Sequence, residues 1–138
     1  MNTLSVVVVS QEREVLRSDA VAQLTAPASE GEVTILPNHV PLITTLKTGL
    51  VTLVLESGST EKIVVSKGFL TVQPDNSVSI MVDAGTHERE ASAAKAEAAI
   101  KQAQEVIRTS KDRRELLLAE ASLKRALLEQ QLAMRNRN

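Results

Sequence analysis

The chain changes character within residues 77–100, which read SVSIMVDAGTHEREASAAKAEAAI. The first six of these residues form a short run rich in β-branched side chains, which is typical of a strand. After Ala84-Gly85 the chain turns to alanine, lysine, glutamate and leucine, and it has no proline or glycine through Asn138. That composition favours helices. The sequence therefore predicts two parts joined at about residue 85, a domain of residues 1–85 and a domain of residues 86–138.

Short apolar runs ended by turn residues recur throughout the first part. We expect strands at residues 4–9, 19–24, 33–36, 50–55, 62–66, 69–72 and 77–82. Residues 56–59 (Glu-Ser-Gly-Ser) are typical of a tight hairpin turn, and residues 73–76 (Gln-Pro-Asp-Asn) place proline where a type I turn favours it. Strands so closely spaced leave no room for helices between them, so the pattern predicts antiparallel pairing in a sandwich or barrel.

The second part has helix-forming composition with one interruption, at residues 109–112 (Thr-Ser-Lys-Asp). We expect one helix over about residues 88–108 and another over about residues 112–134, antiparallel because the connection is short. The fold class predicted for the whole chain is thus α+β, an antiparallel β-sandwich followed by an α-helical hairpin.

Apolar residues at helical spacing predict how the two helices meet. The expected stripes are Ala96, Ala99, Ile100, Ala103 and Ile107 on the first helix and Leu116, Ala119, Leu123, Ala126 and Leu127 on the second. A buried alanine methyl contributes roughly 1 kcal/mol less than a buried leucine. This alanine-rich seam should therefore hold the hairpin weakly enough to detach, and Leu118, Leu128 and Leu132, which lie off the stripe, need a second surface.

The net charge of -1 hides an asymmetry between the two parts. Up to Thr86, five basic residues oppose nine acidic ones, whereas after it eleven basic residues oppose eight. The basic excess lies entirely from Lys111 onward. A basic last helix suits an acidic protein surface.

Composition also excludes several classes of function. No apolar run approaches the ~20 residues of a membrane-spanning helix, and no export signal is visible at the N-terminus. The chain has no cysteine, which fits a reducing cytosol and leaves no thiolate metal site. Phe69 is the single aromatic residue, so stacking on nucleic-acid bases is not expected.

Candidate catalytic groups are few. The sequence has no glycine-rich phosphate loop, nucleophile elbow or paired metal-ligand spacing, and we expect no catalytic residue, metal site or cofactor. His39, followed by Val40-Pro41, is more often a structural loop residue than a catalyst. His87, at the junction, is expected in a linker or in the first turn of a helix.

Residues 31–49 (GEVTILPNHVPLITTLKTG) carry a more specific pattern: Gly-Glu, an apolar pair, Pro-x-His-x-Pro, two apolar residues, a hydroxyl and a final glycine. This pattern resembles the signature of the epsilon subunit of F-type ATP synthases. Residues 68–72 (GFLTV) are similar to a strand of that family, and residues 121–126 (ASLKRA) to its second helix. The resemblance covers essentially the whole chain.

The resemblance implies a non-catalytic rotor-stalk subunit of a proton-translocating complex, peripheral on the cytoplasmic face of the bacterial inner membrane. The β-sandwich would bind the gamma subunit and rest on the ring of c subunits, with Glu32 and His39 in the loop that faces the ring. The hairpin would extend toward the alpha and beta subunits and restrain ATP hydrolysis. Its contacts would be Arg113, Arg114, Lys124 and Arg125, for which the alternative is a solvated helix face.

The chain departs from the family at one motif. Members that bind ATP carry Ile/Leu-Asp-x-x-Arg-Ala at the start of the first helix, whereas this chain has Ala91, Ser92, Lys95 and Ala96 at the corresponding positions. The change removes the carboxylate and replaces the planar donor fork of arginine by a point charge. We therefore expect ATP binding to be weak or absent.

Two other functions stay open at this stage. The chain could be a free-standing β-sandwich module whose hairpin captures a helical partner, which co-purification with a membrane-bound ATPase would distinguish. An enzyme in its own right has little support, because the sequence offers no nucleophile beside a base.

Overall fold

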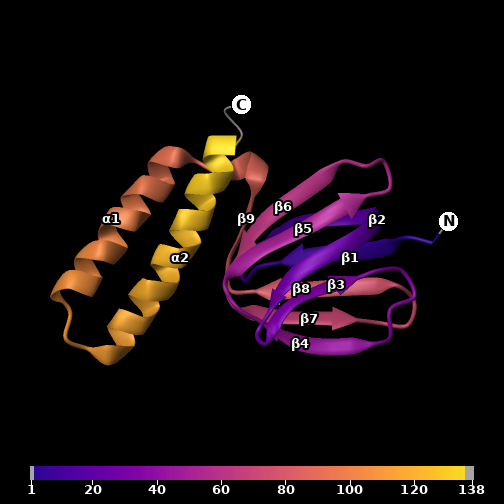
Figure 1. Cartoon of the computed structure of the whole chain (residues 1–138), viewed down its shortest axis with the longest axis horizontal. Helices are drawn as coiled ribbons and strands as arrows, with labels where there is room; N and C mark the ends of the chain where they lie inside the picture. The colour runs from indigo at the N-terminus through magenta and orange to yellow at the C-terminus, as the bar shows by residue number, and fades with distance from the viewer. Residues whose placement is uncertain (1, 136–138) are drawn as a thin grey trace. The chain divides into compact units, whose positions relative to one another are not determined.

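The computed structural model describes residues 2–135, which form two compact units (Figure 1). The first unit ends at His87 and the second begins at Glu88. This division lies two residues beyond the expected junction, because Gly85–His87 form a short strand, β9, that pairs with the sandwich. The first unit therefore includes the three residues after Ala84.

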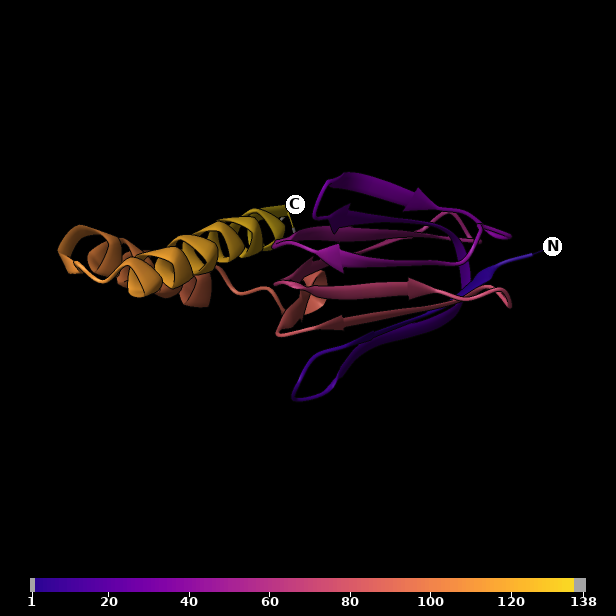
Figure 2. The same ribbon diagram turned by 90° about the horizontal axis from the view of Figure 1, so that it is seen from below.

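The first unit is a β-sandwich of nine strands (Figure 2). They are β1 (Leu4–Val9), β2 (Glu14–Ala28), β3 (Gly31–Ile35), β4 (Leu42–Leu46), β5 (Gly49–Leu55), β6 (Thr60–Val65), β7 (Gly68–Val72), β8 (Ser77–Val82) and β9 (Gly85–His87). One layer has the order β1-β8-β7-β4, and the other contains β3, β2, β5, β6 and β9. Strand β2 is 15 residues long and takes part in both layers, pairing with β1 through its first half and with β3 and β5 through its second.

The predicted sandwich is confirmed, with differences in detail. Strands β1 and β8 have the expected bounds, whereas β2 extends well beyond residues 19–24 in both directions. Strands β4 and β9 were not predicted. The pairing is also not wholly antiparallel, because β1 and β8 run parallel. Both expected turns are present: Gly58 N–H donates to the carbonyl of Leu55, and Asn76 N–H to that of Gln73.

Alternation along the strands builds one core between the layers. Strand β1 buries Leu4, Val6 and Val8 and leaves Val7 and Val9 half-buried, so it is not fully covered on both faces. The largest fully buried side chains include Leu24, Ile35, Leu53, Ile63, Leu70 and Ile80. Every member of the core cluster belongs to the first unit. The sandwich thus has a hydrophobic core of its own.

The second unit is a helical hairpin of α1 (Ala93–Thr109) and α2 (Arg113–Arg135), preceded by a 3-10 turn, η1 (Glu88–Glu90). The expected start of the first helix at residue 88 was wrong by five residues. Ser92 caps α1, because its side chain accepts a hydrogen bond from the backbone N–H of Lys95. Asp112 caps α2, its Oδ1 accepting from the N–H of Arg114 at 2.9 Å, and the helix begins one residue after the expected start.

The seam between α1 and α2 is built from small side chains, as predicted. The buried residues of the two helices are Ala96, Ala103, Ala119, Ala126, Leu132 and Ala133, so five of the six are alanine. Two members of the expected stripes, Ala99 and Leu127, are exposed, so the prediction was wrong at these two positions. Of the leucines expected to need a second surface, Leu132 is buried, Leu128 is half-buried and Leu118 is exposed.

Candidate functional site

The loop between β3 and β4, residues 36–41, carries the Pro-Asn-His-Val-Pro part of the sequence pattern. The N–H of His39 donates to the carbonyl of Leu36 at 3.1 Å, which closes a four-residue turn. Pro37 occupies its second position and Asn38, with φ +68°, its third, which is the arrangement of a type II turn. Leu36 and Val40 are 51% and 71% exposed, so the loop presents an apolar tip.

The two residues expected in this loop lie at different places. His39 lies in the loop, half-buried, and its Nδ1 donates to the carbonyl oxygen of Val40 at 2.7 Å. Glu32, by contrast, lies in β3, opposite Pro27 of β2 and exposed to solvent. Glu32 is the second residue of β3, and His39 lies four residues beyond the end of that strand. The expectation that both belong to one loop was therefore wrong for Glu32.

His87 also differs from expectation, since it lies in neither a linker nor a helix. It is the last residue of β9, it is 7% exposed, and its Nε2 lies 2.5 Å from Oε2 of Glu61 on β6. This pair ties the end of the sandwich chain to the neighbouring strand. Sequence alone did not show the pairing because 26 residues separate the partners.

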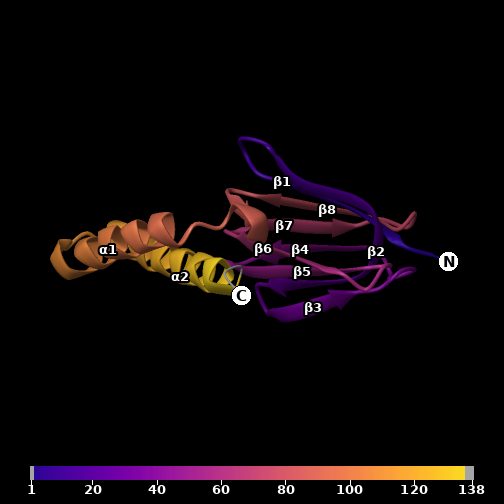
Figure 3. The same cartoon turned by 90° about the horizontal axis from the view of Figure 1, so that it is seen from above.

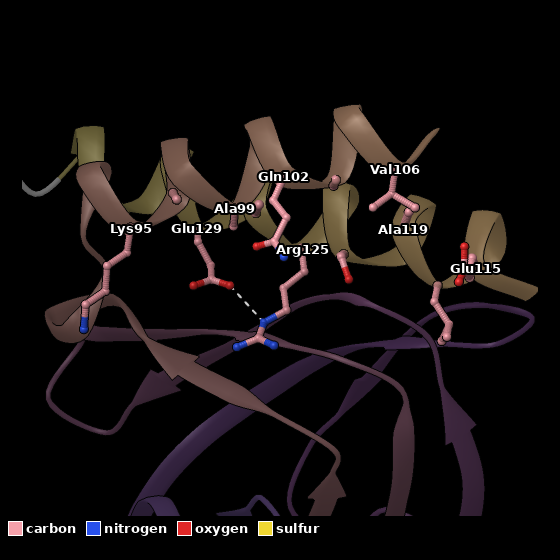
Figure 4. A pocket seen from close by; sticks show the side chains of 13 residues that line it. Lys95, Ala99, Gln102, Val106, Glu115, Ala119, Arg125 and Glu129 are labelled. Atoms are coloured by element: carbon pink, nitrogen blue, oxygen red, sulfur yellow. Dashed lines mark ion pairs between the residues drawn. The ribbon is translucent and has the colours of Figure 1, made fainter. Parts of the chain in front are cut away.

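A groove of about 670 Å³ runs along one side of the hairpin (Figure 4). Lys95 of α1 and Arg125 and Glu129 of α2 project from this side together. The Nε of Arg125 lies 2.9 Å from Oε1 of Glu129 in the geometry of an ion pair rather than of an aligned hydrogen bond. The groove therefore holds both signs of charge, with Glu115 adding a second carboxylate.

The four positions of the ATP motif all lie at the start of α1 or just before it. Ser92 is the N-cap, Lys95 and Ala96 line the groove, and Ala91 lies between η1 and the cap. Replacing aspartate by serine at the cap keeps a side-chain acceptor for the backbone N–H of Lys95. The position thus retains a structural role without a carboxylate.

The four basic residues assigned to α2 fall into two groups. Arg113, Arg114 and Lys124 are exposed, whereas Arg125 is half-buried and paired with Glu129. Residues 11 apart on a helix differ by about 20° around its axis, so Arg113 shares a face with Lys124, and Arg114 with Arg125. Because they are exposed, Arg113, Arg114 and Lys124 are accessible to an acidic partner, whereas Arg125 is already paired within the hairpin.

An exposed apolar row on the outer face of β4, β7 and β8 was not predicted. Ile43, Phe69 and Met81 are 74%, 57% and 62% exposed. Phe69 lies opposite Met81 across β7 and β8, and Ile43 lies two residues from Thr45, the partner of Phe69 on β4. The signal was present, since alternation with buried Leu70 and Val72 turns the single aromatic residue outward. Exposed apolar side chains on three neighbouring strands of one sandwich face are a candidate protein contact.

Residues 2–135 contain no group of three or more His, Cys, Asp or Glu side chains arranged to hold a metal ion. Nor does this part of the chain contain a helix with the length and hydropathy needed to span a bilayer.

These features define a class: an α+β protein of one β-sandwich and one helical hairpin whose candidate sites are surfaces for protein contact. The family model described as "ATP synthase, Delta/Epsilon chain, beta-sandwich domain" matches residues 3–88. The ATP synthase epsilon chain of Bordetella petrii is 37% identical over 123 residues, 89% of this chain and 86% of that relative. That of Pelotomaculum thermopropionicum is 42% identical over 98 residues, 71% of each chain. The chain belongs to the family of ATP synthase epsilon chains.

The fold is also shared with solved structures. A chain in the cryo-EM structure of Euglena gracilis mitochondrial ATP synthase, described as OSCP/F1/c-ring in rotational state 1, has a TM-score of 0.78 at 24% identity. The match covers 96% of this chain and 82% of that chain.

Proposed function

We propose that this chain is the epsilon subunit of the central stalk of a proton-translocating F-type ATP synthase. Its β-sandwich joins the gamma subunit to the ring of c subunits, and its helical hairpin restrains ATP hydrolysis. The chain itself performs no chemistry in this proposal, because the catalytic sites belong to other subunits. It is placed peripherally, on the cytoplasmic face of the bacterial inner membrane, and held there only through the complex.

One observation carries this proposal: the similarity to ATP synthase epsilon chains extends over both units. A match of 123 residues is longer than the first unit, which ends at His87, so it has to continue into the hairpin. A free-standing module that shared only the sandwich with this family would match these relatives only over the first unit. The family relationship therefore supports a role in which both units take part.

Two surfaces of the sandwich suit two partners. The apolar row Ile43, Phe69 and Met81 offers an exposed hydrophobic surface, which supports its assignment to the gamma subunit. The loop of residues 36–41 offers a compact tip held by two prolines, which supports its assignment to the c ring because fixed φ angles reduce the entropy lost on docking. Glu32 would contribute from β3 rather than from the loop.

The hairpin has the properties that a movable inhibitory element needs. Its seam is made mainly of alanine, so separating the two helices exposes little apolar area. Arg113, Arg114 and Lys124 supply exposed positive charge for acidic surfaces of the alpha and beta subunits. Arg125 joins them only if its ion pair with Glu129 opens.

ATP binding by this chain is proposed to be weak or absent. The two carboxylates of the groove, Glu115 and Glu129, oppose a polyphosphate, and Arg125 is already paired. Lys95 supplies a point charge without the bidentate geometry of arginine. Isothermal titration of ATP into the full chain is expected to give no micromolar binding, and micromolar affinity would contradict this part of the proposal.

Purification tests the function as a whole. A tagged full-length chain, expressed in its own organism, is expected to bring down a membrane-bound ATPase containing gamma and c subunits after mild detergent extraction. Recovery with soluble proteins alone, without an ATPase, would favour the free-standing module instead. A Phe69→Asp variant should reduce recovery of the ATPase while the sandwich stays folded, because the Phe69 side chain is exposed.

A further inference from the structure

A pair of asparagines joins two loops that are 38 residues apart in the sequence. Asn38 lies in the loop of residues 36–41, and Asn76 lies in the turn between β7 and β8, at the same end of the sandwich (Figure 3). The backbone N–H of Asn38 donates to Oδ1 of Asn76 at 2.7 Å. The Nδ2 of Asn76 donates in return to Oδ1 of Asn38 at 3.4 Å. We call these two hydrogen bonds the asparagine clasp.

Both residues of the clasp have an unusual backbone conformation. Asn38 has φ +68° and Asn76 has φ +67°, and they are the only residues other than glycine with positive φ among those the structure describes. Asparagine tolerates this region better than most residues, so both positions are restricted in what they accept. The backbone N–H of Asn38 is satisfied by the side chain of Asn76, outside its own turn.

Asn76 is itself held firmly by the sandwich. Its N–H donates to the carbonyl of Gln73 at 3.2 Å, and its carbonyl accepts from the N–H of Ser5 on β1 at 2.9 Å. Asn2 adds a longer contact of 3.5 Å to Oδ1 of Asn38, at the limit of a hydrogen bond. The clasp therefore anchors the loop to the β1, β7 and β8 framework through Asn76.

We infer that Asn76 is a positioning residue that fixes the loop of residues 36–41 in the conformation that docks on the c ring. The inference rests on the proposed function, and it adds a residue outside the loop that controls it. Docking of the exposed apolar tip, Leu36 and Val40, is more favourable when the loop is already ordered, because ordering it on contact would cost conformational entropy. The clasp removes that cost by ordering the loop in the free chain.

The chain offers a matched set of variants. Asn76→Gly removes both hydrogen bonds of the clasp while keeping a residue that accepts φ +67°. Asn76→Asp keeps the acceptor for the N–H of Asn38 and should rescue the clasp, since the amide of Asn38 can rotate to donate to the second carboxylate oxygen. Asn2→Ala removes the weaker contact to the same acceptor and serves as the control. Thermal unfolding of each full-length variant confirms that it is folded.

Hydrogen exchange tests the clasp without reference to any partner. In Asn76→Gly the backbone amide of Asn38 should exchange at least about tenfold faster than in the parent chain, whereas Asn76→Asp and Asn2→Ala should stay near the parent rate. Unchanged exchange in Asn76→Gly would overturn the clasp.

The ratio of ATP-driven proton pumping to ATP hydrolysis tests whether Asn76 positions the loop. An ATP synthase depleted of this subunit is reassembled with each variant, and ATP-driven proton pumping is divided by ATP hydrolysis. We expect Asn76→Gly and the tip variant Val40→Asp each to lower this ratio by about threefold or more, and Asn76→Asp to restore it. If Val40→Asp lowers the ratio and Asn76→Gly does not, the positioning role is wrong and the loop contact stands. If Val40→Asp has no effect, the loop contact of the proposed function fails, and the positioning role fails with it.

Discussion

Gly68 opens β7 at a point where the neighbouring strand leaves no space for a side chain. A Cβ atom built on Gly68 would lie 2.0 Å from the carbonyl oxygen of Met81 and 2.7 Å from the Cα of Val82. Both are backbone atoms of β8, which pairs with β7 through this position. The glycine of the Gly-Phe-Leu-Thr-Val segment is thus required by the close approach of two strands.

Replacing Gly68 by alanine should lower the free energy of unfolding by about 2–4 kcal/mol, because backbone has to shift to admit the methyl group. Denaturant unfolding of the full chain measures this effect. Phe69→Ala in the same strand is the control, and it should cost less than about 1 kcal/mol because the Phe69 side chain is exposed. Equal losses in the two variants would contradict the packing argument.

Asp75, in the turn between β7 and β8, gives the stability of the sandwich a dependence on pH. Hydrogen bonds from the side chain and then the backbone N–H of Ser77 lower the pKa of Asp75 below its ordinary value of 3.8. A lowered folded-state pKa means that the contribution to stability is present above about pH 4 and is lost as the pH falls through the folded-state value. Thermal midpoints between pH 2 and pH 6 should therefore fall less on acidification in Asp75→Asn than in the parent chain. Parallel curves would contradict this assignment.

At the scale of single elements, α1 shows how a cap sets where a helix begins. Composition favours helix from Glu88 onward, yet η1 ends at Glu90 and α1 begins only after Ser92. The Ser92 side chain accepts from the N–H of Lys95 at 3.3 Å and satisfies one of the donors that a helix start leaves unpaired. The cap therefore separates the turn leaving the sandwich from the helix of the hairpin.

Ser92→Ala should destabilise the first turn of α1 by about 1 kcal/mol, and Ser92→Asp should not, because aspartate is an equally good cap. Amide exchange at Lys95 in the full chain measures this, with an expected increase of about fivefold in the alanine variant. The aspartate variant also restores the carboxylate of the ATP motif, so titrating it with ATP separates the two roles. A gain in ATP affinity would show that the missing carboxylate limits binding.

At the scale of the whole molecule, the chain consists of two units with separate sources of stability. The sandwich has a core of large aliphatic side chains, whereas the hairpin buries mainly alanine. The sandwich should therefore fold without the hairpin. The position of the cut matters, because ending the chain at Gly85 would remove His87 and leave the partly buried Glu61 without that partner.

A chain truncated after His87 should fold and should raise the ATP hydrolysis rate of the reassembled complex, because the inhibitory hairpin is absent. The rate is compared with that of complexes carrying the full chain at matched subunit occupancy. A charge-reversal variant, Arg113→Glu with Lys124→Glu, provides a control that keeps both helices, and it should raise the rate part of the way. An unchanged rate after truncation would remove the inhibitory role.

Local pattern predicted much of this molecule. Alternating β-branched runs predicted most of the sandwich strands, and the Pro-containing turn before β8 was predicted from its residues alone, because these features depend on neighbours a few positions away. Strand β4 was not predicted because Leu42–Leu46 directly follows the proline-bracketed loop, and no turn residue separates the two segments. Strand β9 was missed because its three residues carry no strand pattern and are recruited by β6.

The sequence by itself determined the two-part organisation, the alanine-rich seam and the family pattern of residues 31–49, since composition and short-range spacing encode these directly. Only the tertiary structure decided the parallel pairing of β1 with β8, the burial of His87 against Glu61, the ion pair of Arg125 with Glu129 and the clasp of Asn38 with Asn76. The reason is physical, because three of these four contacts join residues 26 or more positions apart. The fourth, the Arg125–Glu129 pair, depends on the direction of two side chains within one helix. The three long-range contacts depend on how whole strands are brought together by burial of the common core, which no local pattern specifies.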